Sequence, residues 1–97
     1  MDELEFEWNP TKAASNERKH GISFEEAETV FYDEFARLLP DPDHSIREER
    51  FLLLGMSEEA RLLLVVHVYR SSSNVIRLIS ARRATRYERQ QYEEFAP

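Results

Sequence analysis

Apolar residues recur along the chain with the two-residue period of strands in some stretches and with helical spacing in others. The alternation at residues 4–8 predicts a strand with one buried face, because successive side chains of a strand point to opposite sides. Runs of Val, Ile and Leu predict further strands. In chain order, the expected strands are residues 4–8, 35–39, 49–56, 61–70 and 75–80. The polar segment 71–74 predicts a turn that joins the last two strands as an antiparallel hairpin.

Helix signals follow the first strand. Asn9 before Pro10 is typical of a helix start, and Gly21 is typical of a helix end. Ser23 and Glu26 have the spacing of a capping box at the start of a second helix. In such a box Ser23 accepts a bond from a backbone amide, and the Glu26 side chain reaches back to the amide of the capping residue. We therefore expect two consecutive helices before the second strand.

A third helix is expected to begin near residues 81–84 and to run to about Glu94. Arg82, Arg86 and Arg89 would recur at helical spacing on it and form a basic ridge. The resulting order is strand, helix, helix, four strands and helix. This order favours an α+β fold with a central, mainly antiparallel sheet that is packed by helices.

Length and composition predict the number of domains, the kinds of site that are excluded and the cellular compartment. The 97 residues suit one small domain, residues 1–97, and no apolar run approaches the roughly 18 residues of a membrane span. Cysteine is absent, which excludes disulfides, thiol catalysis and cysteine metal sites. The acidic start differs from a signal peptide, which would be basic and then apolar. We expect a cytoplasmic protein that does not engage a membrane.

The net charge of −6 is unevenly distributed. Residues 1–59 contain sixteen acids and six Lys or Arg, whereas residues 60–89 contain seven arginines and one acid. A focused basic patch on an acidic body can attract a polyanion locally while limiting unselective binding. The charge pattern therefore keeps nucleic acid open as a partner despite the acidic total.

Arg77 interrupts an apolar strand and marks a candidate site. It lies two residues from Val75 and from Ile79 and shares their face, opposite Ile76, Leu78 and Ser80. On the preceding strand, the face that resembles it holds Arg61, Leu63, Val65, His67 and Tyr69. The hairpin could bring His67, Tyr69 or Arg70 near Arg77, although the sequence does not fix the register. Pairing of Arg77 with one of the many acids remains the simpler alternative.

Metal and nucleotide sites lack their usual residues. The only glycines are Gly21 and Gly55, too few for a phosphate cradle, and no histidine pair has zinc spacing. Asp41, Asp43 and His44 could ligate a metal, but a segment rich in Asp and Pro is more simply a turn. We expect no cofactor and no metal, and a site of Arg, His and Tyr if there is one.

Several segments resemble the BrnT family of bacterial toxins over nearly the whole chain. The best matches are KHGISFEEA at residues 19–27 and IRLISARRAT at 76–85, supported by FEWNP at 6–10 and His44-Ser45. The resemblance implies a RelE-like fold and a type II toxin-antitoxin system. It also implies ribonuclease activity that arrests translation. The implied partner is a BrnA-like antitoxin, whose DNA-binding part represses the shared operon.

The resemblance also nominates residues. It matches Lys19, His20, Arg77 and Arg82 directly, and Arg61 and His67 lie in the strand before the second segment. The predicted catalytic set is Lys19, His20, Arg61, His67, Arg77 and Arg82, and the predicted RNA-binding set is Tyr69, Arg70, Arg83, Arg86 and Arg89. His20 could equally be a structural histidine at its helix end.

These residue types suit RNA cleavage without a metal. A base takes the 2′-hydroxyl proton, that oxygen attacks the adjacent phosphorus, and an acid protonates the leaving 5′-oxygen. Arginine forks bind phosphate oxygens and stabilise developing charge, and histidine transfers protons near neutral pH. Two alternatives stay open: a ParE-like toxin that poisons DNA gyrase through protein contacts, and a non-catalytic interaction module.

Overall fold

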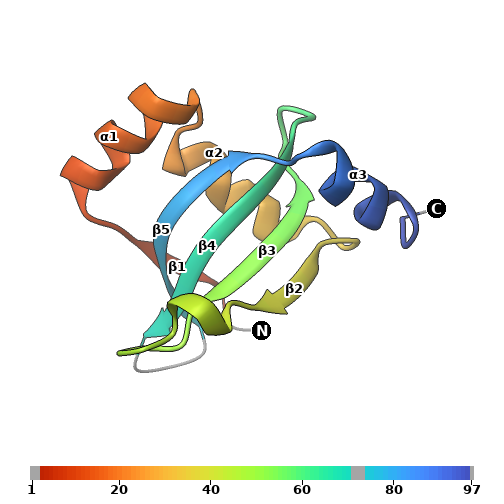
Figure 1. Cartoon of the computed structure of the whole chain (residues 1–97). Helices are drawn as coiled ribbons and strands as arrows, with labels where there is room; N and C mark the ends of the chain where they lie inside the picture. Colours follow the sequence, from red (N-terminus) through yellow and green to blue (C-terminus); the bar gives the residue numbers. More distant parts are fainter. Residues whose placement is uncertain (1–2, 71–73, 97) are drawn as a thin grey trace.

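Five strands form one sheet in the computed structural model of the chain, which describes residues 3–70 and 74–96. Their order is β1-β5-β4-β3-β2 (Figure 1), with β1 parallel to β5 and all other neighbours antiparallel. The strands are β1 (Glu5–Glu7), β2 (Arg37–Pro40), β3 (Phe51–Met56), β4 (Leu62–Arg70) and β5 (Val75–Arg83). The helices are α1 (Pro10–His20), α2 (Phe24–Thr29) and α3 (Arg86–Glu93), with 3₁₀ turns η1 (Val30–Tyr32) and η2 (Pro42–His44).

This arrangement confirms the predicted α+β class, the order of the elements and the mainly antiparallel sheet. The predicted turn at residues 71–74 falls mainly on Ser71–Ser73, which lie outside the described residues. Within residues 3–70 and 74–96, the helices are all too short or too polar to cross a membrane.

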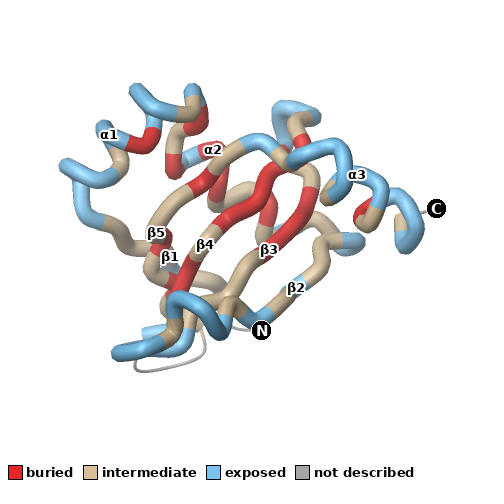
Figure 2. Tube along the Cα trace, in the orientation of Figure 1, coloured by how far each residue is buried: buried red, intermediate tan, exposed pale blue. Residues whose placement is uncertain are grey.

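Two apolar layers lie on opposite faces of the sheet. Figure 2 shows that buried residues are concentrated in the central strands β4 and β3 and in α2. The larger layer packs α2 against β4 and β5 and consists of Ile22, Phe24, Ala27, Val30, Leu53, Leu63, Val65, Ile76, Leu78 and Ala81. Tyr92 of α3 covers one corner of the other face, where Leu54, Leu62 and Leu64 lie. The Tyr92 hydroxyl also donates a 2.7 Å bond to Asp33. The helices therefore leave part of the second face uncovered.

The predicted ends of α1 are confirmed. The Asn9 side chain accepts bonds from the amides of Thr11 and Lys12, and Gly21 ends the helix at a φ of 71°. Glycine reaches this left-handed conformation without the steric cost that a Cβ imposes.

The predicted capping box of α2 is half right. Ser23 accepts the 3.0 Å bond from the Glu26 amide, as expected. The Glu26 carboxylate, however, does not return to the start of the helix and instead binds Arg61 and Ser57. A buried carboxylate is stabilised more by a guanidinium than by one backbone amide, so the tertiary partner prevails.

The predicted start of the last helix is wrong. Ala81, Arg82 and Arg83 pair with Val65, Leu64 and Leu63 and extend β5 as strand. The helix α3 begins only at Arg86, after a capping box formed by Thr85 and Glu88. Arg82 therefore lies on a strand, and the predicted ridge of Arg82, Arg86 and Arg89 on one helix does not exist.

The predicted shared face of His67 and Arg77 is also wrong. In β4, His67 pairs with Leu78, whereas Val68 pairs with Arg77, and paired residues share a face of the sheet. His67 consequently points toward the larger apolar layer and Arg77 toward the opposite face.

A bulge in β5 accounts for a further difference. Val66 pairs with Ser80 and His67 with Leu78, so that Ile79 is an extra residue in β5. The bulge shifts the alternation by one, and Ser80 and Arg82 thereby share the face of Arg77 instead of the face of Leu78. Sequence alternation alone placed Ser80 on the wrong side.

Candidate nucleic-acid interface between α1 and β5

A groove lies between α1 and the bulged part of β5. It is a cavity of about 210 Å³ and is lined by Lys12, Ser15, Asn16, Lys19, His20, Ile79 and Ser80. We call it the α1–β5 groove. It brings together the two segments that carry the strongest resemblance, with Lys19 and His20 from the first and Ile79 and Ser80 from the second.

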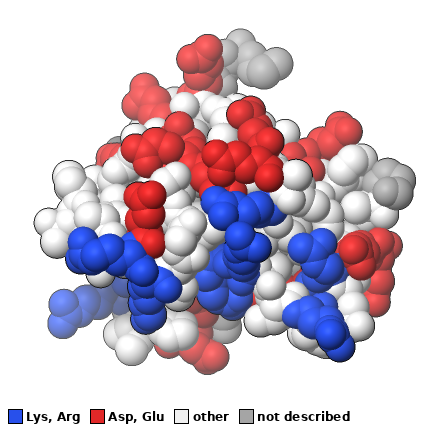
Figure 3. All heavy atoms as spheres, turned by 90° about the horizontal axis from the view of Figure 1, so that it is seen from above, with Lys and Arg blue, Asp and Glu red and all other residues white. Residues whose placement is uncertain are grey.

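The electrostatics of the α1–β5 groove are one-sided. Lys12 and Lys19 are exposed and His20 is partly exposed, and among the described residues no carboxylate forms an ion pair with any of the three. Figure 3 shows basic side chains in a band across this end of the molecule, with acidic side chains mostly to one side of the band. An exposed, unneutralised pair of lysines beside hydroxyl groups can bind a phosphate diester.

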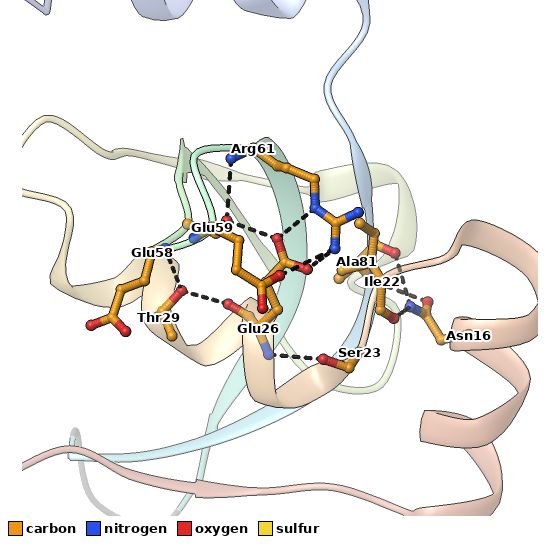
Figure 4. Close-up of polar contacts among 10 residues, drawn as sticks. Asn16, Ile22, Ser23, Glu26, Thr29, Glu58, Glu59, Arg61 and Ala81 are labelled. Atoms are coloured by element: carbon orange, nitrogen blue, oxygen red, sulfur yellow. Dashed lines mark hydrogen bonds and ion pairs between the residues drawn. The ribbon is translucent and has the colours of Figure 1, made fainter.

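Arg61 lies elsewhere, in a closed cluster at the start of β4 (Figure 4). Its guanidinium forms a two-pronged ion pair with Glu26, whose side chain is only 2% exposed, and it also contacts Glu59 at 3.3 Å. Ser57 donates a 2.7 Å bond to the same Glu26 carboxylate. The hydrogen bonds from Arg61 lower the pKa of Glu26 and outweigh the opposing effect of burial.

Arg82 is also paired. Its two terminal nitrogens donate to both carboxylate oxygens of Glu88 at 2.9 and 3.0 Å, and Glu88 caps α3 at the same time. This hydrogen bonding raises the pKa of Arg82 and lowers that of Glu88. The pair ties the end of β5 to the start of α3.

Arg77 and Arg70 approach one carboxylate from neighbouring strands. The Glu7 side chain lies 3.5 Å from Arg77 and 3.6 Å from Arg70, and all three side chains are partly exposed. These distances are long for ion pairs, and the arrangement resembles the surface pairing that the sequence allowed as the simpler alternative. Arg77 is thus brought near Arg70, as expected, but not near His67.

His67 is fully buried. Its ring donates to the Val65 carbonyl oxygen at 3.2 Å, lies 3.4 Å from the Tyr69 hydroxyl and packs against Phe31 at 4.8 Å between ring centres. Burial lowers the pKa of His67 to about 4, which favours the neutral ring. Tyr69, at the outer end of the same aromatic cluster, is 39% exposed.

The remaining predicted RNA-binding arginines are exposed but lie outside the α1–β5 groove. Arg83 ends β5, and Arg86 and Arg89 lie on α3, where Arg89 approaches Glu93 at 3.9 Å. Arg83 and Arg86 form no ion pair with a described residue.

The segment with Asp41, Asp43 and His44 forms the predicted turn. Its 3₁₀ turn η2 is followed by Ser45, and the His44 ring lies 3.1 Å from the Asp41 carboxylate. In the part of the chain that the structure describes, His, Asp and Glu side chains form no group of three or more that could hold a metal ion.

Of the residues that line the α1–β5 groove, only Lys19 and His20 were predicted from sequence as site residues. Lys12 precedes Lys19 by seven residues, the spacing of one helix face, and this signal was available. Ser80 was assigned to the opposite face, because a bulge leaves no mark in an apolar run. The groove itself depends on where α1 docks, which sequence spacing does not specify.

Comparison with known proteins identifies a matching family and a similar solved structure. A family model described as "Ribonuclease toxin, BrnT, of type II toxin-antitoxin system" matches residues 8–88. The fold is similar to the crystal structure of the Brucella abortus ribonuclease toxin, BrnT, with a TM-score of 0.65 and 21% identity. That similarity covers 86% of this chain and 99% of the Brucella chain, and at this identity it shows the fold alone. No curated protein gives a significant match to the chain.

Proposed function

Because the chain belongs to the BrnT family of ribonuclease toxins of type II toxin-antitoxin systems, we propose that it binds and cleaves RNA in the α1–β5 groove. The observation that carries this proposal is the joining of Lys12, Lys19 and His20 with Ser80 in one cavity without an opposing carboxylate. A phosphate diester needs positive charge and hydrogen-bond donors at its oxygens, and the groove offers both.

The proposed reaction uses the side chains of the groove and solvent water. His20 takes the proton from the 2′-hydroxyl, the 2′-oxygen attacks phosphorus and displaces the 5′-oxygen, and a water molecule protonates the leaving 5′-oxygen. Lys12 and Lys19 stabilise the charge that develops on the phosphate oxygens, which is the role that a metal serves in other nucleases. The products are a 2′,3′-cyclic phosphate and a 5′-hydroxyl.

The arginines divide into two groups by their partners. Arg77 lies three residues before Ser80 on the same face, about 10 Å away along the strand, and is placed to contact a neighbouring phosphate. Arg83 offers a further unpaired charge. We assign RNA contacts also to Arg70, Arg86, Arg89 and Tyr69. We assign Arg61, Arg82 and His67 to support of the fold, because both arginines form two-pronged bonds to a carboxylate and His67 is fully buried.

The partner of a type II toxin is an antitoxin protein, and we propose a BrnA-like one that acts in the cytoplasm and covers the α1–β5 groove. Contact with operator DNA then occurs only through the antitoxin. The family match describes a ribonuclease, so no observation favours a gyrase poison or a non-catalytic module.

The test is cleavage of labelled RNA in EDTA, free and on translating ribosomes, by wild type, Lys19→Ala and His20→Ala. We expect cleavage by wild type with 2′,3′-cyclic ends, and a loss of rate of roughly 10²-fold or more in both variants. Arg18→Ala is the matched control, because Arg18 is an exposed cation on the same helix that does not line the groove. Equal cleavage by all four proteins, or 5′-phosphate products, would overturn the proposal.

A further inference from the structure

Asn16 joins α1 to β5 at the floor of the α1–β5 groove (Figure 4). Its side-chain amide donates to the carbonyl oxygens of Ala81 at 2.9 Å and Ile22 at 3.0 Å, and its oxygen accepts from the Ala81 amide at 3.0 Å. The side chain therefore binds both backbone groups of Ala81, which are 65 residues away in sequence. A neighbouring strand would satisfy these groups in the same way.

A substitute strand is needed at this point of β5. The edge strand β1 pairs only with Val75–Arg77 and ends before Ala81. An unpaired buried amide and carbonyl would each cost free energy, and the carboxamide of Asn16 removes both penalties at once.

The contact also determines how α1 sits on the sheet. Among the residues of α1, Asn16 alone is buried, at 7% exposed, and the apolar packing of the helix on the core comes from the small, partly buried side chain of Ala13. Lys12 and Lys19 lie on either side of Asn16 along the helix, and Ser80 precedes Ala81 directly. The three bonds thus define the distance across the groove, from the helix cations to the bulged strand.

We propose that Asn16 is a positioning residue, which holds Lys12, Lys19 and His20 in register with Ser80 through its bonds to Ala81. This inference rests on the proposed function and deepens it. Asn16 takes no part in the chemistry. Its role is to keep α1, which carries the lysines, and β5, which carries Ser80, at the separation that fits one phosphate diester. Misplacement of reacting groups by about 1 Å can lower the rate by roughly 10²-fold.

The test compares two variants of Asn16 with a control elsewhere in the fold. Asn16→Ala removes three hydrogen bonds, and Asn16→Asp keeps the acceptor for Ala81 but loses both donors. Asp33→Ala is the control, since Asp33 also accepts three bonds, from Met56, Phe35 and Tyr92, at the far side of the sheet. For each protein, kcat and KM for RNA cleavage are measured at a temperature where it is fully folded.

We expect Asn16→Ala to lower kcat by roughly 30-fold or more and to change KM by less than about threefold, because geometry rather than charge is lost. The Ala81 amide should exchange its hydrogen faster in this variant, which reports the broken contact independently of activity. Asp33→Ala should lower the melting temperature with an unchanged kcat. In Asn16→Asp, the ratio of its kcat to that of wild type should rise as pH falls, since the protonated carboxyl regains one donor.

Two results would overturn the positioning role. One is fast Ala81 exchange with an unchanged kcat in either Asn16 variant, and the other is an equal kcat loss in Asp33→Ala. Should Asn16→Ala not fold, Asn16→Asp carries the test through its pH ratio. Failure of the proposed function is distinguishable, because Lys19→Ala and His20→Ala would then cleave as wild type does.

Discussion

The α1–β5 groove and the cluster around Glu26 both contain basic side chains at one end of the molecule, yet they differ in what faces the charge. In the cluster, Arg61 is paired with the carboxylate of Glu26, whose side chain is 2% exposed. The Ser57 hydroxyl donates a further hydrogen bond to the same carboxylate. In the groove, Lys12 and Lys19 meet no described carboxylate. A basic residue held by short bonds to a buried carboxylate is occupied within the protein, whereas the groove lysines keep their charge available to a ligand.

Burial explains the difference. The Glu26 carboxylate is buried between its own helix α2 and the β3–β4 hairpin, where an unpaired charge would be costly, so a guanidinium is required beside it. The groove lysines are exposed and water can solvate them without a partner. The first arrangement stabilises the fold, and the second leaves a surface that attracts anions.

The largest effect should come from making the groove resemble the cluster. Ser80→Glu places a carboxylate opposite Lys12 and Lys19, where it competes with the phosphate and repels it. We expect the initial rate of RNA cleavage to fall by roughly 10²-fold or more, with little change in melting temperature. Arg18→Gln lowers the net charge by the same one unit outside the groove and should retain most of the activity. A fully active Ser80→Glu variant would place RNA binding elsewhere.

The next effect comes from opening the cluster. Arg61→Ala leaves the Glu26 carboxylate buried without its counter-charge, so the melting temperature should fall by on the order of 15 °C. Cleavage per folded molecule should stay as in wild type. The double variant Arg61→Met and Glu26→Met should recover much of the loss, because the buried charge is gone. A specific loss of kcat in Arg61→Ala would instead return Arg61 to the reacting groups.

His67 extends the comparison to pH. Burial holds the pKa of His67 at about 4 in the folded protein, below the value of about 6.5 in an unfolded chain. Between these values only the unfolded state binds the proton, so stability is lost as pH falls below about 6.5. The loss from pH 7 to pH 5 should be about 2 kcal/mol, measured by denaturant unfolding. His67→Phe should lack most of this loss, and an unchanged pH dependence would mean that another group causes it.

Arg77 should show the smallest effect. Its pairing with Glu7 is long and partly exposed, so Arg77→Gln should change the free energy of unfolding by less than about 1 kcal/mol. RNA binding should weaken by a few-fold through KM, with a shallower dependence on salt, since one phosphate contact is lost. A large fall in kcat at constant KM would contradict this assignment and move Arg77 into the reaction.

Sequence could predict the elements but not how their faces meet. Asn9 and Gly21 mark α1 by local chemistry, and the alternation at residues 4–8 marks β1, so both were found. The bulge at Ile79 depends on pairing with β4, and it moved Ser80 and Arg82 to the other face. The pairing of Glu26 with Arg61 was missed for two reasons. Arg61 is distant in sequence, and a local capping role already accounted for a glutamate at position 26.

The candidate site follows the same division. Lys19 and His20 were found through a resemblance between segments, and both line the groove. His67 was predicted as a site residue because the pairing register of β4 and β5, which the sequence does not fix, could have placed it near Arg77. In the structure the register turns His67 to the other face of the sheet, where it is buried. Local sequence patterns identify candidate site residues, whereas the way α1 docks on the sheet determines which of these residues line the same cavity.

The bonds between Asn16 and Ala81 also have a consequence for synthesis. The two walls of the groove come from nearly opposite ends of the chain, and β1 finds its partner only in β5. On the ribosome, α1 is complete long before the strand on which it must dock, so the sheet and the groove close only after residue 81 has emerged. A prematurely terminated chain that lacks β5 has no second wall. Under the proposed function, such a truncated chain has no site for RNA cleavage.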